Sequence, residues 1–131
     1  MLARVTEVHF ERIRERYAGA SIRPLPSGAA LVTVPSVPLP PGWSAKETTV
    51  YFLVPVGYPG PTPDCFWADQ GLLLANGTAP QASNVSEVPE GGLVGRWFSW
   101  HVVGAQQHWN PNRDDLMTFM SIIRDRFQQA Q

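Results

Sequence analysis

The sequence predicts a single α+β domain over residues 1–131, with an antiparallel sheet of about four strands and helices from both ends of the chain packed on it. Apolar residues recur at helical spacing near both ends of the chain, which indicates two amphipathic helices. Ten of the 13 prolines lie between Pro24 and Pro63. Because proline fixes φ and removes a backbone donor, this interval excludes helix and favours short strands joined by stiff turns.

The first helix is expected over residues 4–18, and Gly19 provides a stop after it. One face is apolar and consists of Val5, Val8, Phe10, Ile13 and Tyr17. Arginines and glutamates form the opposite face, with His9 expected at the surface. That face is interpreted as solvated, and docking of a partner on its basic residues is the alternative; these are Arg4, Arg12 and Arg16.

Four strands are expected in the middle of the chain. Residues 21–25 and 29–34 are read as a hairpin with a Pro-Ser-Gly turn between them. Residues 48–54 form an apolar, β-branched and aromatic run that predicts a buried third strand. Residues 64–68 resume a strand-like pattern after a proline-rich turn and form the fourth. Short intervals of this kind favour one antiparallel meander.

The second half of the chain is expected to be loop followed by helix. Residues 71–95 are rich in glycine, so a loop is predicted there, with a short strand at most over residues 72–74. Asn112 is the expected N-cap of the last helix, with Asp115 three residues on. The helix has a clear apolar face made of Leu116, Phe119, Met120, Ile123 and Phe127.

Composition excludes several classes of function. A net charge of −1 gives no electrostatic basis for binding nucleic acid or an anionic membrane. No apolar stretch is as long as a membrane span, and the N-terminus lacks a signal-peptide core. A single cysteine cannot form an internal disulfide, which favours a reducing compartment and hence a cytoplasmic location. No glycine-rich phosphate loop follows a strand, so a nucleotide cofactor is not expected.

The order of the elements resembles the ubiquitin-conjugating (E2) superfamily, and within it the bacterial E2-like families associated with ubiquitin-like modifier systems. Three stretches support this resemblance: the buried run 50–54, the Tyr58-Pro59 turn through Pro63 with Phe66 after it, and Trp109-Asn110-Pro111 ahead of the last helix. The resemblance implies a UBC-like fold and two partners, an E1-like adenylating enzyme and a ubiquitin-like modifier. It also implies transfer of the activated modifier to an amine, with no metal or cofactor.

The chain departs from the standard pattern at the active site. It has no His-Pro-Asn tripeptide. The nucleophilic cysteine of the standard enzymes lies eight residues before the tryptophan that matches Trp109, and position 101 is a histidine here. The single cysteine is Cys65, in the expected fourth strand. Either the nucleophile has moved, or the domain forms no thioester.

Three residues are therefore candidates for the acyl-transfer site. Cys65 is the one available thiol, and with a pKa of about 8.5 it needs a neighbour such as His101 or His108 to increase its thiolate fraction. His101 can act as acid or base or accept the acyl group itself, and Ser99 would form an oxyester. A zinc site from the thiol and two histidines is not favoured, because their spacing fits no known pattern.

Each candidate also has a structural interpretation. Cys65 shares a strand face with Trp67, so a Trp67 packed under a helix would make the thiol a small buried hydrophobe. His101 would then be a histidine hydrogen-bonded to the backbone. The sequence leaves three functions open: an E2-like carrier, a catalytically inactive module that binds a modifier or an E1-like enzyme, and a structural domain unrelated to modifiers.

Overall fold

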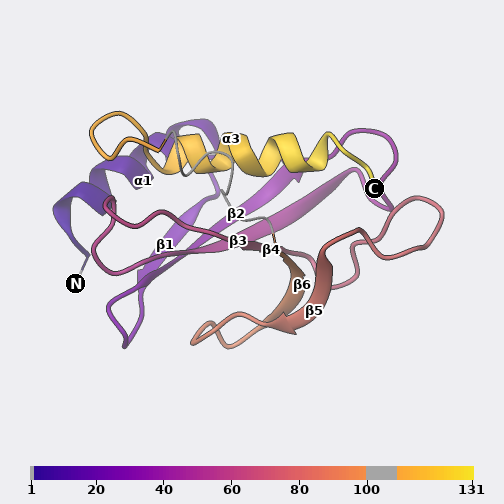
Figure 1. Cartoon of the computed structure of the whole chain (residues 1–131), viewed down its shortest axis with the longest axis horizontal. Helices are drawn as coiled ribbons and strands as arrows, with labels where there is room; N and C mark the ends of the chain where they lie inside the picture. Colours follow the sequence, from indigo (N-terminus) through magenta and orange to yellow (C-terminus); the bar gives the residue numbers. More distant parts are fainter. Residues whose placement is uncertain (1, 100–108) are drawn as a thin grey trace.

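A computed structural model describes residues 2–99 and 109–131, and in these residues two helices cover one face of a six-stranded antiparallel sheet (Figure 1). The strand order is β1-β2-β3-β4-β6-β5, so β1 and β5 form the edges. The elements are α1 (Arg4–Arg16), β1 (Ser21–Pro24), β2 (Ala30–Pro38), β3 (Glu47–Val54), β4 (Phe66–Ala68), β5 (Ser83–Glu87), β6 (Val94–Phe98) and α3 (Leu116–Phe127). The predicted α+β class is confirmed.

The expected number of about four strands is wrong, because the prediction omitted the β5–β6 hairpin. β5 lies inside the stretch 71–95 that was expected to be loop. Its five residues are mostly polar, and Val85 is 40% exposed, so the strand is held by backbone pairing with β6 rather than by an apolar face. Residues 72–74 form no strand; Leu74 makes an isolated bridge with Trp43.

The main core lies between the sheet and the two helices. Alternate residues of β3, Val50, Phe52 and Val54, point to the helices and are buried, as the period of a strand requires. Phe66 stacks on Phe98 across the β4–β6 pair, with ring centroids 4.9 Å apart. Burial of side chains of this size contributes about 1.5–3 kcal/mol each, so this layer is the main source of stability.

The two helices follow the predicted faces with two corrections. All five residues expected on the apolar face of α3 are buried, whereas Val8 of α1 is 40% exposed. The N-cap of α3 is Asp115, not Asn112, because Asp115 and Thr118 form a reciprocal capping box. An ion pair of 2.6 Å between Arg12 and Asp115 joins the helices. In the described residues neither helix is long and apolar enough to cross a membrane.

A second, smaller core covers the face of the sheet away from the helices. Its buried members are Leu25, Leu31, Trp67 and Val88. The loop between β5 and β6 folds onto the β1–β2 hairpin, where Arg23 donates to the Gly91 carbonyl at 2.8 Å and the Ser27 amide donates to Glu90 at 3.0 Å. The sheet is therefore covered on both faces beside β4.

Candidate functional site

Cys65 lies at the end of the β4–β6 strand pair, directly before β4. The register pairs Phe66 with Phe98, so continuing it by one position sets Cys65 opposite Ser99. The Ser99 amide donates to the Ala82 carbonyl at 2.8 Å, on the β5 side. Ser99 and Cys65 are therefore a non-hydrogen-bonded pair, the type in which opposed side chains lie closest. By this extension of the register, Cys65 and Ser99 lie on neighbouring segments of the chain.

The Cys65 side chain belongs to the smaller core. It is partly buried and packs with Trp97 against Trp67, on the face away from the helices. Trp67 is 3% exposed and shares this cluster with Cys65, as the alternation of the strand predicted; in the described residues neither α1 nor α3 covers it. The β5–β6 loop covers it instead, and the thiol keeps partial access to solvent.

The surroundings of Cys65 favour the protonated thiol. Burial is the main cause that raises the pKa of Cys65 to about 11; a hydrogen bond with Trp97 opposes this rise, and the neighbouring Asp64 adds to it. At pH 7 about one thiol in ten thousand is then ionised. The described residues therefore hold Cys65 as a weak nucleophile.

Of the other two predicted residues, the structure describes Ser99 but not His101. Ser99 is partly buried and follows β6 directly. Its backbone amide donates to the carbonyl of Ala82, the residue before β5. His101 and His108 lie outside the described residues, and so does the expected approach of Cys65 to His101. Within the described ranges 2–99 and 109–131, no three His, Cys, Asp or Glu side chains are grouped to hold a metal ion.

The two proline motifs of the sequence meet in space. The Trp109 indole Nε1 donates to the Pro59 carbonyl at 3.1 Å, which attaches the Trp-x-Pro segment to the turn of residues 58–63. On the helix side, the Tyr58 hydroxyl lies 2.7 Å from His9 Nδ1. His9 was expected at the surface; it is partly buried, and burial first, then Arg12, lowers its pKa against the opposing effect of Asp115. No sequence spacing indicated this contact.

Two hollows flank Asp64. One, of about 300 Å³, includes Cys65 and Glu90 and opens between the β1–β2 hairpin and the end of β3. The other, of about 350 Å³, lies between the turn of residues 58–63 and Trp109. Asp64 and Thr62 line both, so the surface around the thiol is continuous with the surface around the tryptophan.

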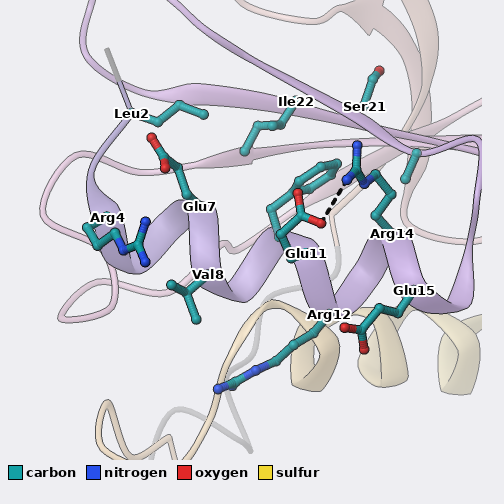
Figure 2. A pocket seen from close by; sticks show the side chains of 12 residues that line it. Leu2, Arg4, Glu7, Val8, Glu11, Arg12, Arg14, Glu15, Ser21 and Ile22 are labelled. Atoms are coloured by element: carbon teal, nitrogen blue, oxygen red, sulfur yellow. Dashed lines mark ion pairs between the residues drawn. The ribbon is translucent and has the colours of Figure 1, made fainter.

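A larger hollow of about 710 Å³ runs between α1 and β1 (Figure 2). Figure 2 shows charged side chains of both signs along α1, with Glu11 paired with Arg14 and Ile22 of β1 opposite them. The two charged groups of this ion pair are 3.0 Å apart. None of Cys65, Ser99 and Asp64 is among its described lining residues. These candidate site residues therefore lie away from this hollow, on the other side of the sheet beside β4.

Residues 20–130 match the family described as prokaryotic E2 family E. The chain belongs to this family. The match extends from the residue before β1 to beyond α3 and includes both proline motifs, while α1 precedes it. Comparison of the family E protein with curated proteins and with solved structures gave no match. The predicted prokaryotic E2-like assignment is confirmed, and it supports an E2-like role with E1-like and modifier partners in general.

Proposed function

We propose that this family E protein is a carrier with a UBC-like fold in a bacterial ubiquitin-like modifier pathway. It accepts the activated modifier from an E1-like adenylating enzyme and passes it to an amine. The main support is the place of Cys65 opposite Ser99, which is two positions before residue 101, where the standard pattern has its nucleophile.

The proposed reaction has two acyl transfers. The Cys65 thiolate attacks the carbonyl carbon of the modifier's thioester on the E1-like enzyme; a new C–S bond forms, and the enzyme's own thiolate leaves. An acceptor amine then attacks the same carbon, a C–N bond forms, and Cys65 leaves as thiolate while the amine loses a proton. His101 is proposed as the acid or base, and Ser99 as the alternative acyl carrier through an oxyester. The proposed location is the cytoplasm, where a lone thiol stays reduced.

The raised pKa of Cys65 supports a second function. A thiol held protonated by burial and by Asp64 is a poor acyl acceptor, which favours a catalytically inactive module that binds the modifier or the E1-like enzyme. The carrier function requires that a partner removes this proton, for example by placing a cation beside the thiol. The two proposals therefore differ in one observable, the covalent adduct.

Incubation with ATP, a modifier and an E1-like enzyme from the same genome separates these proposals. The expected result is a modifier adduct on a non-reducing gel that thiol reagents remove and that Cys65→Ala abolishes. Ser99→Ala, which leaves Cys65 in place, should retain the adduct. An adduct that resists thiol but not alkali, and that Ser99→Ala removes, would assign the carrier role to Ser99. Binding of the modifier without any adduct would favour the binding module.

A further inference from the structure

The hollow between the turn of residues 58–63 and Trp109 combines three kinds of surface. Its walls are apolar and rigid, formed by Pro61, Pro111 and the Trp109 ring. Its polar groups are the Asp64 carboxylate and the Thr62 hydroxyl. Among the described lining residues there is no basic side chain. A hollow with apolar walls and one carboxylate is complementary to a flexible alkyl chain that ends in a cation.

The polar groups of this hollow act as acceptors. The Thr62 hydroxyl donates its proton to the Pro63 carbonyl at 3.1 Å, so toward a further partner its oxygen can act only as an acceptor. Asp64 interacts with the Cys65 thiol, and a carboxylate with two oxygens accepts several hydrogen bonds at once. A primary ammonium has three donors and no acceptor, and it matches this set.

The Trp109 ring is held in place by its own hydrogen bond. Because Nε1 donates to the Pro59 carbonyl at 3.1 Å, the edge of the indole is fixed against the turn. Its lining position leaves part of the ring in contact with the hollow. An ammonium within about 6 Å of such a ring is attracted to its face, and tryptophan gives the strongest of these contacts.

We propose that this hollow, defined by Thr62, Asp64 and Trp109, binds the side chain of the acceptor lysine. Its volume of about 350 Å³ is at the lower end of ligand sites and suits a four-carbon stem rather than a cofactor. Asp64 lines both this hollow and the hollow of Cys65, so a lysine bound here lies beside Cys65. The identification of this lysine as an acyl acceptor depends on the proposed function; binding of the ammonium does not.

The test is a titration of a ligand into the protein alone, in which the nuclear magnetic resonance signal of the Trp109 indole N–H is the readout. This signal is assigned by its loss in Trp109→Phe. The ligand is Nα-acetyl-lysine amide, and the matched ligand is Nα-acetyl-norleucine amide, which has an alkyl chain without the ammonium. The expected result is a saturable shift with the lysine derivative and little shift with the norleucine derivative.

Two variants then test the carboxylate. Asp64→Asn keeps the shape of the side chain and should weaken binding about tenfold, the value of one charge-assisted hydrogen bond. Asp125→Asn removes an exposed carboxylate of α3 outside the hollow and should leave binding unchanged. Equal shifts with both ligands, unchanged binding in Asp64→Asn, or no saturable shift would each overturn the inference. Because no modifier or activating enzyme is present, these results are independent of the adduct experiment.

Discussion

Replacement of Arg126 with alanine is expected to lower the free energy of unfolding by about 3 kcal/mol. Arg126 is 3% exposed, and its guanidinium donates to the carbonyls of Gln81, Gln129 and Gln131 at 3.0, 2.7 and 2.9 Å. It also lies 5.1 Å from the centroid of the Phe98 ring. Truncation leaves these carbonyls without their charged donor. Water can reach some of them, since residues 129 and 131 are exposed, so the loss stays below the sum of three separate bonds.

Urea unfolding of the purified variants checks this prediction. The matched control is Arg124→Ala, an exposed arginine on the same helix, which should change the free energy of unfolding by less than about 0.5 kcal/mol. Arg126→Lys keeps a charge but lacks the planar fork, so an intermediate loss is expected. Equal effects of Arg124→Ala and Arg126→Ala would show that Arg126 does not hold the C-terminal segment.

Alkylation of Cys65 by iodoacetamide at pH 7 is expected to be about 30-fold slower than that of an unperturbed thiol. The thiolate fraction is about 300-fold lower, because the pKa is about 11 instead of about 8.5. The greater nucleophilicity of a more basic thiolate restores about tenfold. Partial burial adds to the delay. The rate should rise about tenfold for each pH unit and reach no plateau below pH 10.

The control for this profile is a double variant, Cys65→Ser with Ser121→Cys, which places the single thiol on the exposed surface of α3. Its rate should level off near pH 9. A plateau for Cys65 at the same pH would contradict the raised pKa.

The raised pKa of Cys65 also makes the free energy of unfolding depend on pH, because the folded state holds the Cys65 proton more tightly than the unfolded chain. This contribution is present below about pH 8.5 and is lost as the pH rises to about 11.

The parts of the fold with a strong apolar period were predicted well. The apolar face of α3 follows directly from side-chain spacing, and β3 follows from its continuous apolar run; both elements pack on one core. β5 gave no such signal, since its backbone pairs with β6 while three of its five residues are exposed. The predicted N-cap of α3 was wrong because Asn112 belongs to a local turn. In this turn the Asn112 backbone amide donates to the Asn110 side-chain oxygen at 2.9 Å.

The sequence names the candidate residues but does not define how they are arranged in space. Cys65 and Ser99 are separated by 34 positions, and β4 has three residues, so no local pattern defines which residue of β6 lies opposite the thiol. The His9–Tyr58 contact depends on how α1 lies over the turn, which is a tertiary feature. The Asp64–Trp109 hollow likewise forms because a hydrogen bond joins two distant proline motifs.

The central claim is that the displaced thiol lies beside Ser99, and a cysteine pair tests it most directly. Cys65 is the single cysteine of the chain, so in Ser99→Cys any intramolecular disulfide must join positions 65 and 99. Opposed side chains of a non-hydrogen-bonded pair are close enough for this bond. Mild oxidation should give a monomer 2 Da lighter with no free thiol. Ser83→Cys, across β6 on β5, should keep both thiols. Two free thiols in oxidised Ser99→Cys would contradict the account.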